Sequence, residues 1–275
     1  MDKRVITIII FFAVLAVLLI IGATVFVVRD VEVSFATAEE SNVITSDEII
    51  TASQISTGKN IFAISETRAV SNIEQAYPAV KVINIERKFP STIIVHITAR
   101  IPVMAVKISG QDKYAMLDRE MFVMQIVSAD ELVLREVQYK RALTKTNYEL
   151  QAKDVALGEI ILEKASIMNV LSQHLIVAFE KQGLLNKEFS DFIVNINIVQ
   201  EAHSSAYNLT LKTRTGVDIM FEDGDFDEKV AMAYSWYCDE IERKGSDSDT
   251  VTSGYIIYNN GVDNQGYFSW YRYQG

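Results

Sequence analysis

The chain has 275 residues, of which 49% are hydrophobic, and its formal net charge is −10. This length allows a membrane anchor and two modest domains, while the acidic balance argues against nucleic acid or anionic lipid as the main partner, because basic patches recognise both. The single cysteine, Cys238, excludes an internal disulfide and indicates a fold held by an ordinary hydrophobic core.

The N-terminal segment is predicted to anchor the chain in a membrane. Residues 5–28 carry no charge, and two threonines are their only polar side chains. As a helix rising about 1.5 Å per residue they would reach roughly 36 Å, enough for a hydrocarbon core of about 30 Å. A cleaved signal peptide is the alternative, but its apolar region is usually only about 7–15 residues and ends at a small-residue cleavage site. We therefore assign residues 1–4 to a short cytoplasmic leader and residues 5–28 to a transmembrane helix.

Basic residues set the expected orientation of this span. Lys3 and Arg4 precede it, and Arg29 is the only basic residue immediately after it, which favours an N-terminus inside the cell. We therefore expect a single-pass protein of the cytoplasmic membrane with its C-terminal domains outside the cytoplasm.

A compact α+β unit is predicted to follow the anchor. Residues 31–35 alternate between apolar and polar side chains, as in a half-buried strand. Thr45 or Ser46 can cap a helix, with Glu48 at the third position after Thr45, and this helix should stop near Gly58.

The second half of this unit is predicted to be one helix and two strands. The helix follows Ser65 and ends at Pro78, because proline cannot continue a helix. Residues 80–85 and 92–100 are rich in β-branched residues and read as strands. Two helices on one face of the resulting three-stranded sheet would share one core.

This order of elements resembles a POTRA domain of the FtsQ/DivIB family, a family of bacterial cell-division proteins. The residues that carry the likeness are Ser46-Asp47-Glu48-Ile49-Ile50, Gly58-Lys59-Asn60-Ile61-Phe62, Tyr77-Pro78-Ala79-Val80, Arg87-Lys88-Phe89-Pro90-Ser91-Thr92 and Ala99-Arg100-Ile101-Pro102-Val103-Met104-Ala105. The resemblance implies a POTRA-like domain over residues 29–102. Residues 37–42 form a longer first connection than is usual in the family.

The remainder is predicted to be a mainly antiparallel β-domain with flanking helices. The expected strands are residues 103–108, 114–117, 122–126, 132–137, 191–199, 207–211, 218–221 and 251–258. The expected helices are residues 157–183, which are amphipathic, and residues 225–245, where Asp225 and Glu228 form a capping box. The order resembles the β-domain that follows the POTRA domain in FtsQ/DivIB proteins, and we assign it to residues 103–258.

An aromatic-rich tail is predicted over residues 259–275. Seven aromatic residues lie between Tyr255 and Tyr273, and aromatics are enriched at the centres of protein interfaces. The alternatives are that they close the core of the β-domain or form a tail.

The family resemblance favours an interface at the end of the chain. It implies that the last strand receives a partner segment by strand addition, and that the partners are small single-pass coiled-coil division proteins of the FtsB/DivIC and FtsL type. Tyr255 and Ile257 stand where the family often has an acid and an arginine, so apolar contact is expected there. The predicted partner-binding residues are Tyr255, Ile256, Ile257, Tyr258, Tyr267, Phe268 and Trp270.

No catalytic, cofactor or metal site is predicted. None of the histidines His96, His174 and His203 has a metal-ligand partner at close helical or strand spacing. Residues 223–228 resemble a calcium loop but carry Glu228 where the loop needs glycine.

The expected function is therefore that of a non-enzymatic scaffold of the bacterial divisome, located at the division septum, which controls septum formation through protein contacts. The main alternative is a POTRA-type export or chaperone component that binds client polypeptides by strand addition, although such proteins tend to carry several POTRA units. A membrane-tethered hydrolase is a more distant alternative, since no site for it is found.

Overall fold

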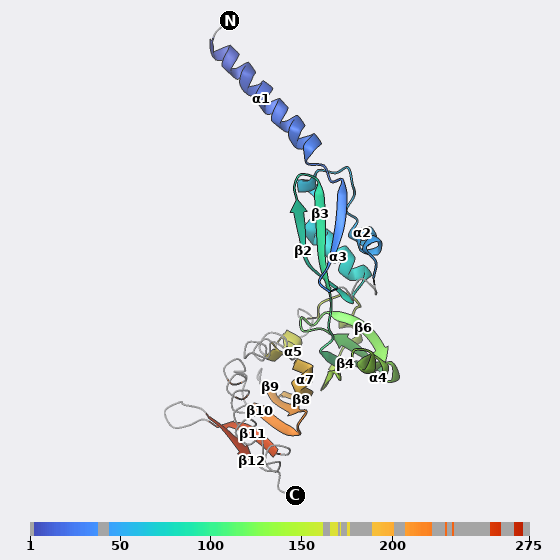
Figure 1. Cartoon of the computed structure of the whole chain (residues 1–275). Coiled ribbons are helices and arrows are strands. Elements are labelled where there is room, and N and C mark those ends of the chain that lie inside the picture. The colour runs from blue at the N-terminus through green and yellow to red at the C-terminus, as the bar shows by residue number, and fades with distance from the viewer. Residues whose placement is uncertain are drawn as a thin grey trace. The chain divides into compact units, whose positions relative to one another are not determined.

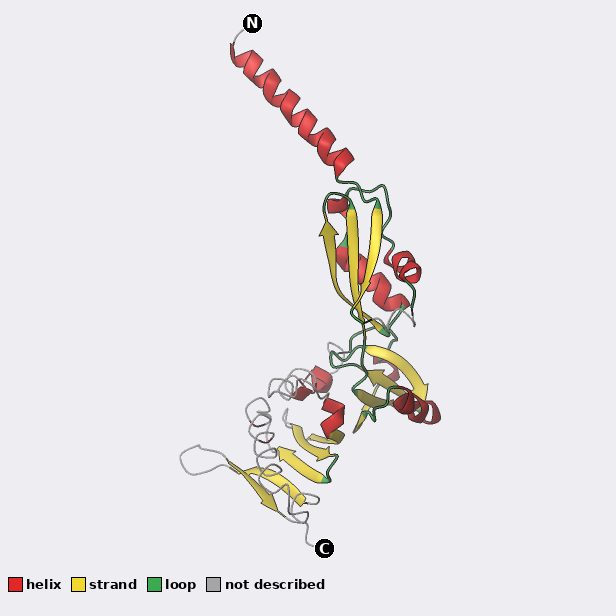
Figure 2. Ribbon diagram, viewed as in Figure 1, coloured by secondary structure: helices red, strands yellow, loops and turns green. Residues whose placement is uncertain are grey.

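The computed structural model describes residues 3–37, 44–161, 166–169, 171, 175–176, 189–200, 207–221, 229, 233, 254–259 and 267–271. The chain forms two compact units, Met1–Arg100 and Ile101–Gly275. Many of their elements are labelled in Figure 1, and Figure 2 colours them by type. Each unit contains its own sheet, so the fold is mixed α+β, as predicted.

The first unit has the predicted order of strand, two helices and two strands. Its elements are α1 (Lys3–Val25), β1 (Asp30–Phe35), α2 (Ser46–Ser53), η2 (Ile61–Ala63), α3 (Glu66–Ala76), β2 (Val80–Lys88) and β3 (Thr92–Ala99). The sheet order is β1-β3-β2, with β1 parallel and β2 antiparallel to the central strand β3. Helix α2 packs against β1 and α3 against β2, and the two helices contact each other.

The N-terminal helix is shorter at its C-terminal end than predicted. Helix α1 ends at Val25, because the next residues pair with the first unit instead: Val27 bridges to Asn60, and Val28 is buried in the core. Among the residues that the structure describes, no helix is long and apolar enough to cross a membrane. The transmembrane span at residues 5–28 thus stays a prediction.

The core of the first unit lies between the sheet and its helices. Ile49 of α2 and Ile73 of α3 are fully buried. The central strand β3 alternates, with Ile93, Val95 and Ile97 buried toward the helices. This is the period-two burial that a strand with one covered face requires.

Helix α2 begins with the predicted capping box. The Thr45 hydroxyl accepts the Glu48 N–H at 3.3 Å, and the Glu48 carboxylate accepts the Thr45 N–H at 2.8 Å. The helix ends at Ser53 rather than near Gly58, because Gln54 adopts a left-handed conformation with φ of 55°. The Thr45 hydrogen bonds, first from its backbone and then from its side chain, lower the pKa of Glu48.

Replacing Thr45 by alanine is expected to lower the free energy of unfolding of the first unit by about 1 kcal/mol, because the Glu48 N–H loses its acceptor. The pKa of Glu48 is lowered in the fold, so its contribution is complete above its ordinary value and is lost as the pH falls through the lowered one. The difference between wild type and Thr45→Ala should therefore shrink in acid. Amide hydrogen exchange of α2 measures both effects. Thr51→Ala, on the exposed side of the same helix, is the control and should leave exchange nearly unchanged.

The second unit is built on one nine-stranded sheet. Its strands are β4 (Met104–Ile108), β5 (Lys113–Leu117), β6 (Val123–Ser128), β7 (Thr144–Leu150), β8 (Ile193–Gln200), β9 (Tyr207–Thr213), β10 (Val217–Phe221), β11 (Gly254–Asn259) and β12 (Tyr267–Tyr271). The sheet order is β12-β11-β10-β9-β8-β7-β4-β5-β6. Parallel pairs join β4 to β7, β7 to β8 and β10 to β11, and the other neighbours are antiparallel.

Two predictions in this unit were wrong in detail. The strand predicted over residues 132–137 is a helix, α4 (Ala129–Gln138), which begins with a capping box between Ser128 and Glu131. Only Leu132 of this helix is buried, and Val133, Leu134 and Val137 are 58%, 69% and 72% exposed. Strand β7 was not predicted, because its sequence is mostly polar, with only its two end residues buried.

The remaining described elements are short. They are η3 (Ala152–Asp154), α5 (Ser166–Asn169) and α7 (Phe189–Phe192). Most of the predicted helices at residues 157–183 and 225–245 lie outside the described residues, as do Cys238, His174, His203 and the loop at residues 223–228.

Candidate partner-binding edge

The predicted partner-binding residues lie on the last two strands, at one end of the large sheet. Strand β11 runs between β10 and β12, and β12 is the terminal strand in the sheet order (Figure 1, red). An end strand presents backbone N–H and C=O groups along one side, where a further strand can pair. At this end of the described sheet, the edge that could receive a further strand therefore belongs to β12 and not to β11, while β6 is the strand at the other end.

This arrangement corrects the boundary predicted at Tyr258. Strand β11 extends to Asn259, and residues 267–271 of the predicted tail form β12, which pairs antiparallel with β11. The physical reason is that residues 267–271 are all aromatic except Ser269, and aromatic residues favour strands.

The side chains of β11 divide between the core and the surface. Ile256 is 0% exposed and lies opposite Ile219 of β10, which is equally buried, in the main core of the second unit. Tyr255 and Ile257 are half-buried and point to the other face, as strand geometry requires. Ile256 was predicted to bind a partner, but its burial gives it a structural role.

Two tyrosines stack across the hairpin. Tyr255 lies opposite Tyr271 in the register, and their rings stack with centroids 5.3 Å apart and planes 21° apart. Tyr271 is 43% exposed, so the pair presents aromatic surface directly at the edge strand. Tyr271 was missing from the predicted set because only the pairing of β11 with β12 shows that it faces Tyr255.

The other predicted residues are placed by register alone. Tyr258 pairs with Phe268, Asn259 with Tyr267, and Ile256 with Trp270. All of the predicted positions thus lie on a single two-stranded hairpin, which brings together residues 254–259 and 267–271.

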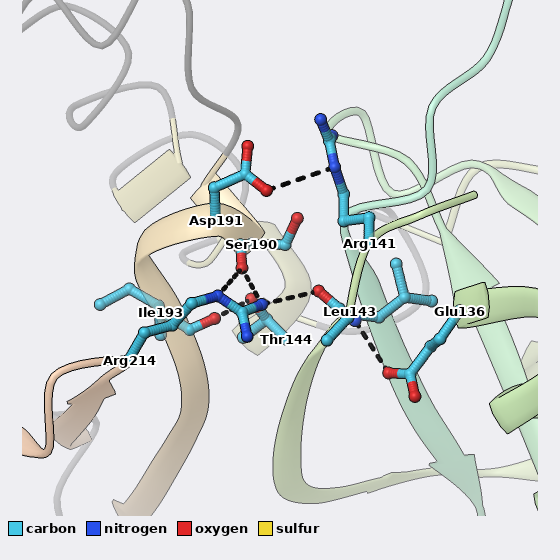
Figure 3. Close-up of polar contacts among 9 residues, drawn as sticks. Glu136, Arg141, Leu143, Thr144, Ser190, Asp191, Ile193 and Arg214 are labelled. Carbon is cyan, nitrogen blue, oxygen red and sulfur yellow. Dashed lines mark hydrogen bonds and ion pairs between the residues drawn. The ribbon is translucent and has the colours of Figure 1, made fainter. Parts of the chain in front are cut away.

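A polar cluster ties the middle of the same sheet together (Figure 3). Arg214, in the turn between β9 and β10, donates through Nε to the Ser190 carbonyl at 3.0 Å and through Nη2 to the Ala142 carbonyl at 2.9 Å. The Thr144 hydroxyl donates to the Ile193 carbonyl at 2.6 Å. These bonds join β7, α7 and the β9–β10 turn, which are distant in the sequence.

Acidic side chains complete this cluster. Arg141 Nε lies 3.4 Å from Asp191 Oδ1. Glu136 at the end of α4 accepts the Leu143 N–H at 2.8 Å. Because the donors are directed at main-chain carbonyls and at these carboxylates, the cluster positions the strands on which the β11–β12 hairpin is assembled.

His96, which lies within the described residues, contacts a carboxylate on the neighbouring strand. His96 on β3 lies 3.0 Å from a carboxylate oxygen of Glu86 on β2. Within the described residues, no group of three or more histidine, cysteine, aspartate or glutamate side chains could hold a metal ion.

Comparison with known proteins identifies the first unit. Residues 29–100 match the family model of the POTRA domain, FtsQ-type. The match spans β1 to β3 with both helices, and it confirms the resemblance to the FtsQ/DivIB family at these residues. No curated protein matches the chain.

Proposed function

We propose that this chain, which carries an FtsQ-type POTRA domain at residues 29–100 and resembles the FtsQ/DivIB family, is a membrane-anchored, non-enzymatic scaffold of the bacterial divisome. A division-related role in protein binding follows from the POTRA type. The finer proposal is that the second unit binds small single-pass coiled-coil partners of the FtsB/DivIC and FtsL type, and so helps control septum formation.

The observation that carries the proposal is the hairpin of β11 and β12 at the end of the nine-stranded sheet. Its terminal strand offers a backbone edge for strand addition. The stacked rings of Tyr255 and Tyr271 beside that edge supply large, rigid apolar surface, the kind of group that contributes most to binding at protein interfaces.

The proposed location is the cytoplasmic membrane at the division septum, with residues 5–28 as the anchor and both units outside the cytoplasm. The apolar sequence of this segment and the basic residues Lys3 and Arg4 before it support this orientation.

The cellular experiment is depletion of the protein in its native host while a fluorescent N-terminal fusion is imaged. A band at mid-cell, with filaments or failed septa on depletion, is the expected result. A uniform envelope signal with normal septation would contradict the divisome proposal and would favour the export alternative.

Replacing Tyr271 by alanine is expected to weaken binding of an FtsB/DivIC-type partner by about thirtyfold, because a stacked aromatic at an interface contributes about 2 kcal/mol. Tyr255→Ala should have a similar effect, since each ring supports the other. The affinity of the full-length chain for the host's FtsB/DivIC-type protein, measured in detergent, checks this prediction. Leu134→Ala, at a 69% exposed position on α4, is the control and should bind like wild type. Equal affinities for all three variants would show that the hairpin is not part of the interface.

A further inference from the structure

Two exposed phenylalanines and one half-buried phenylalanine form a cluster directly after helix α1. The ring of Phe26 lies 5.5 Å from that of Phe62 and 5.9 Å from that of Phe89, and the rings of Phe62 and Phe89 are 5.4 Å apart. Phe62 is nevertheless 60% exposed and Phe89 55% exposed. Each ring contacts both others, so Phe62 and Phe89 present one continuous apolar surface rather than isolated exposed side chains. The half-buried ring of Phe26 joins this surface to the core of the unit.

Backbone hydrogen bonds hold this cluster beside the end of helix α1. Phe26 follows the last residue of α1 directly. The Phe26 carbonyl accepts the Ile61 N–H at 2.8 Å, and the Val28 N–H donates to the Lys59 carbonyl at 2.8 Å. The Asn60 side-chain amide also donates to the carbonyl of Gly22 within the helix, at 3.1 Å. These hydrogen bonds hold residues 59–62 beside residues 22–28, where α1 ends.

The sheet register brings Phe89 to the same end. Asp30, the first residue of β1, pairs with Thr92, the first residue of β3, and the Arg29 N–H donates to the Ser91 carbonyl at 2.8 Å. The turn between β2 and β3, which contains Phe89, therefore lies at the end of the sheet where the chain enters from α1.

Exposed basic residues are close in the sequence to all three phenylalanines. Arg29, Lys59 and Lys88 are exposed and each is within three residues of one of the phenylalanines. Asp30 and Glu86 are the exposed acids at similar sequence distance, and Glu86 lies 3.0 Å from His96. This local balance is opposite in sign to the net charge of −10 of the whole chain. Aromatic rings with a basic border are the composition of a surface that rests at a membrane, where the rings enter the interface and the cations meet lipid phosphates.

We propose that Phe26, Phe62 and Phe89 form a lipid-contacting foot, which seats the membrane-facing end of the POTRA domain in the interface of the bilayer. The inference rests on the proposed anchor, because α1 is what brings this end of the domain to the membrane. The foot would limit the tilting of the first unit relative to the bilayer. It binds lipid in addition to the protein contacts proposed for the second unit.

The experiment measures the depth of individual side chains in the bilayer. The full-length chain with Cys238→Ser receives one nitroxide label through Phe62→Cys, Phe89→Cys, Ile83→Cys or Leu15→Cys. Each variant is reconstituted into phosphatidylcholine vesicles, with or without phosphatidylglycerol, and the accessibility of the label to oxygen and to a water-soluble nickel chelate is compared. Ile83 is the matched control, because it is 57% exposed on β2 of the same unit but belongs to no aromatic cluster. Leu15 reports on α1.

Labels at positions 62 and 89 are expected to show an oxygen-to-nickel accessibility ratio severalfold above that at position 83. The ratio should rise further with phosphatidylglycerol if the basic border meets lipid phosphates, and an unchanged ratio would overturn that part. A high oxygen-to-nickel ratio at position 15 with low ratios at positions 62 and 89 would contradict the proposed lipid contact of the phenylalanines and leave the proposed anchor standing. A low oxygen-to-nickel ratio at position 15 would contradict both the proposed anchor and the proposed lipid contact of the phenylalanines.

Discussion

Replacing Arg100 by methionine is expected to lower the free energy of unfolding of the POTRA unit by about 3 kcal/mol. The Arg100 side chain is 3% exposed, its Nη2 lies 2.9 Å from Glu74 Oε2, and its Nε donates to the Val80 carbonyl at 3.2 Å. The variant would leave the mostly buried Glu74 carboxylate without its cation, and breaking a buried pair on one side typically costs about 3–5 kcal/mol. The lower figure applies because the Val82 N–H still donates to this carboxylate.

The pair also explains why an arginine stands at this point of the sequence. Arg100 follows β3 directly, and its N–H donates to the Ala79 carbonyl at 2.8 Å, while Glu74 lies on α3. One side chain therefore joins the last strand, the start of β2 and the second helix, and closes the domain at its C-terminal end.

Hydrogen exchange of peptides from α3 and β2, measured on the full-length chain, checks this prediction. Arg68→Met is the matched control, because Arg68 is exposed on the same helix, and surface substitutions usually change stability by less than about 0.5 kcal/mol. Equal losses in the two variants would mean that burial of the ion pair is not what stabilises the domain.

The sequence predicted the first unit well because its signals are local. Thr45, one of the two candidate caps, caps the first helix, and the second helix begins at Glu66, directly after Ser65, close to where it was predicted. The apolar alternation of β1 and β3 corresponds to the face that the helices cover. Each of these signals acts within a few residues, so no knowledge of the tertiary fold is needed to interpret it.

The two errors in the second unit have different causes, one local and one distant. The apolar residues Val133, Leu134 and Val137 suggested a strand, although the Ser128–Glu131 capping box beside them indicates a helix. Strand β7 has little apolar pattern and is held by parallel pairing with β4 and β8. Parallel pairing joins segments far apart in the chain, so no short-range pattern reveals it.

The candidate edge shows the same division between local and distant information. Aromatic composition directed attention to residues 255–271, which contain the last two strands of the sheet. Which residues face the core and which face outward depends on the register of β11 with β10 and β12. That register assigns Ile256 to the core and brings Tyr271 beside Tyr255.

Replacing Ile256 by alanine is expected to lower the free energy of unfolding of the second unit by about 3 kcal/mol, because truncating a fully buried isoleucine leaves a cavity in the core. Hydrogen exchange of peptides covering β10 and β11 is the measurement. Ile257→Ala is the matched control: its side chain is half-buried on the opposite face, so its loss of stability should be clearly smaller. Equal losses would contradict the register of β11 in the sheet.

The same variants separate folding from binding at the hairpin. Ile256→Ala should weaken partner binding only to the extent that β11 loses protection from hydrogen exchange. The reason is that the Ile256 side chain is buried in the core, where a partner cannot contact it. Tyr255→Ala should weaken binding while protection of β10 stays at the wild-type level, since Tyr255 lies on the outward face and stacks on Tyr271. If Ile256→Ala weakened binding with unchanged protection, its side chain would have to contact the partner directly, as the aromatic composition of the segment first suggested.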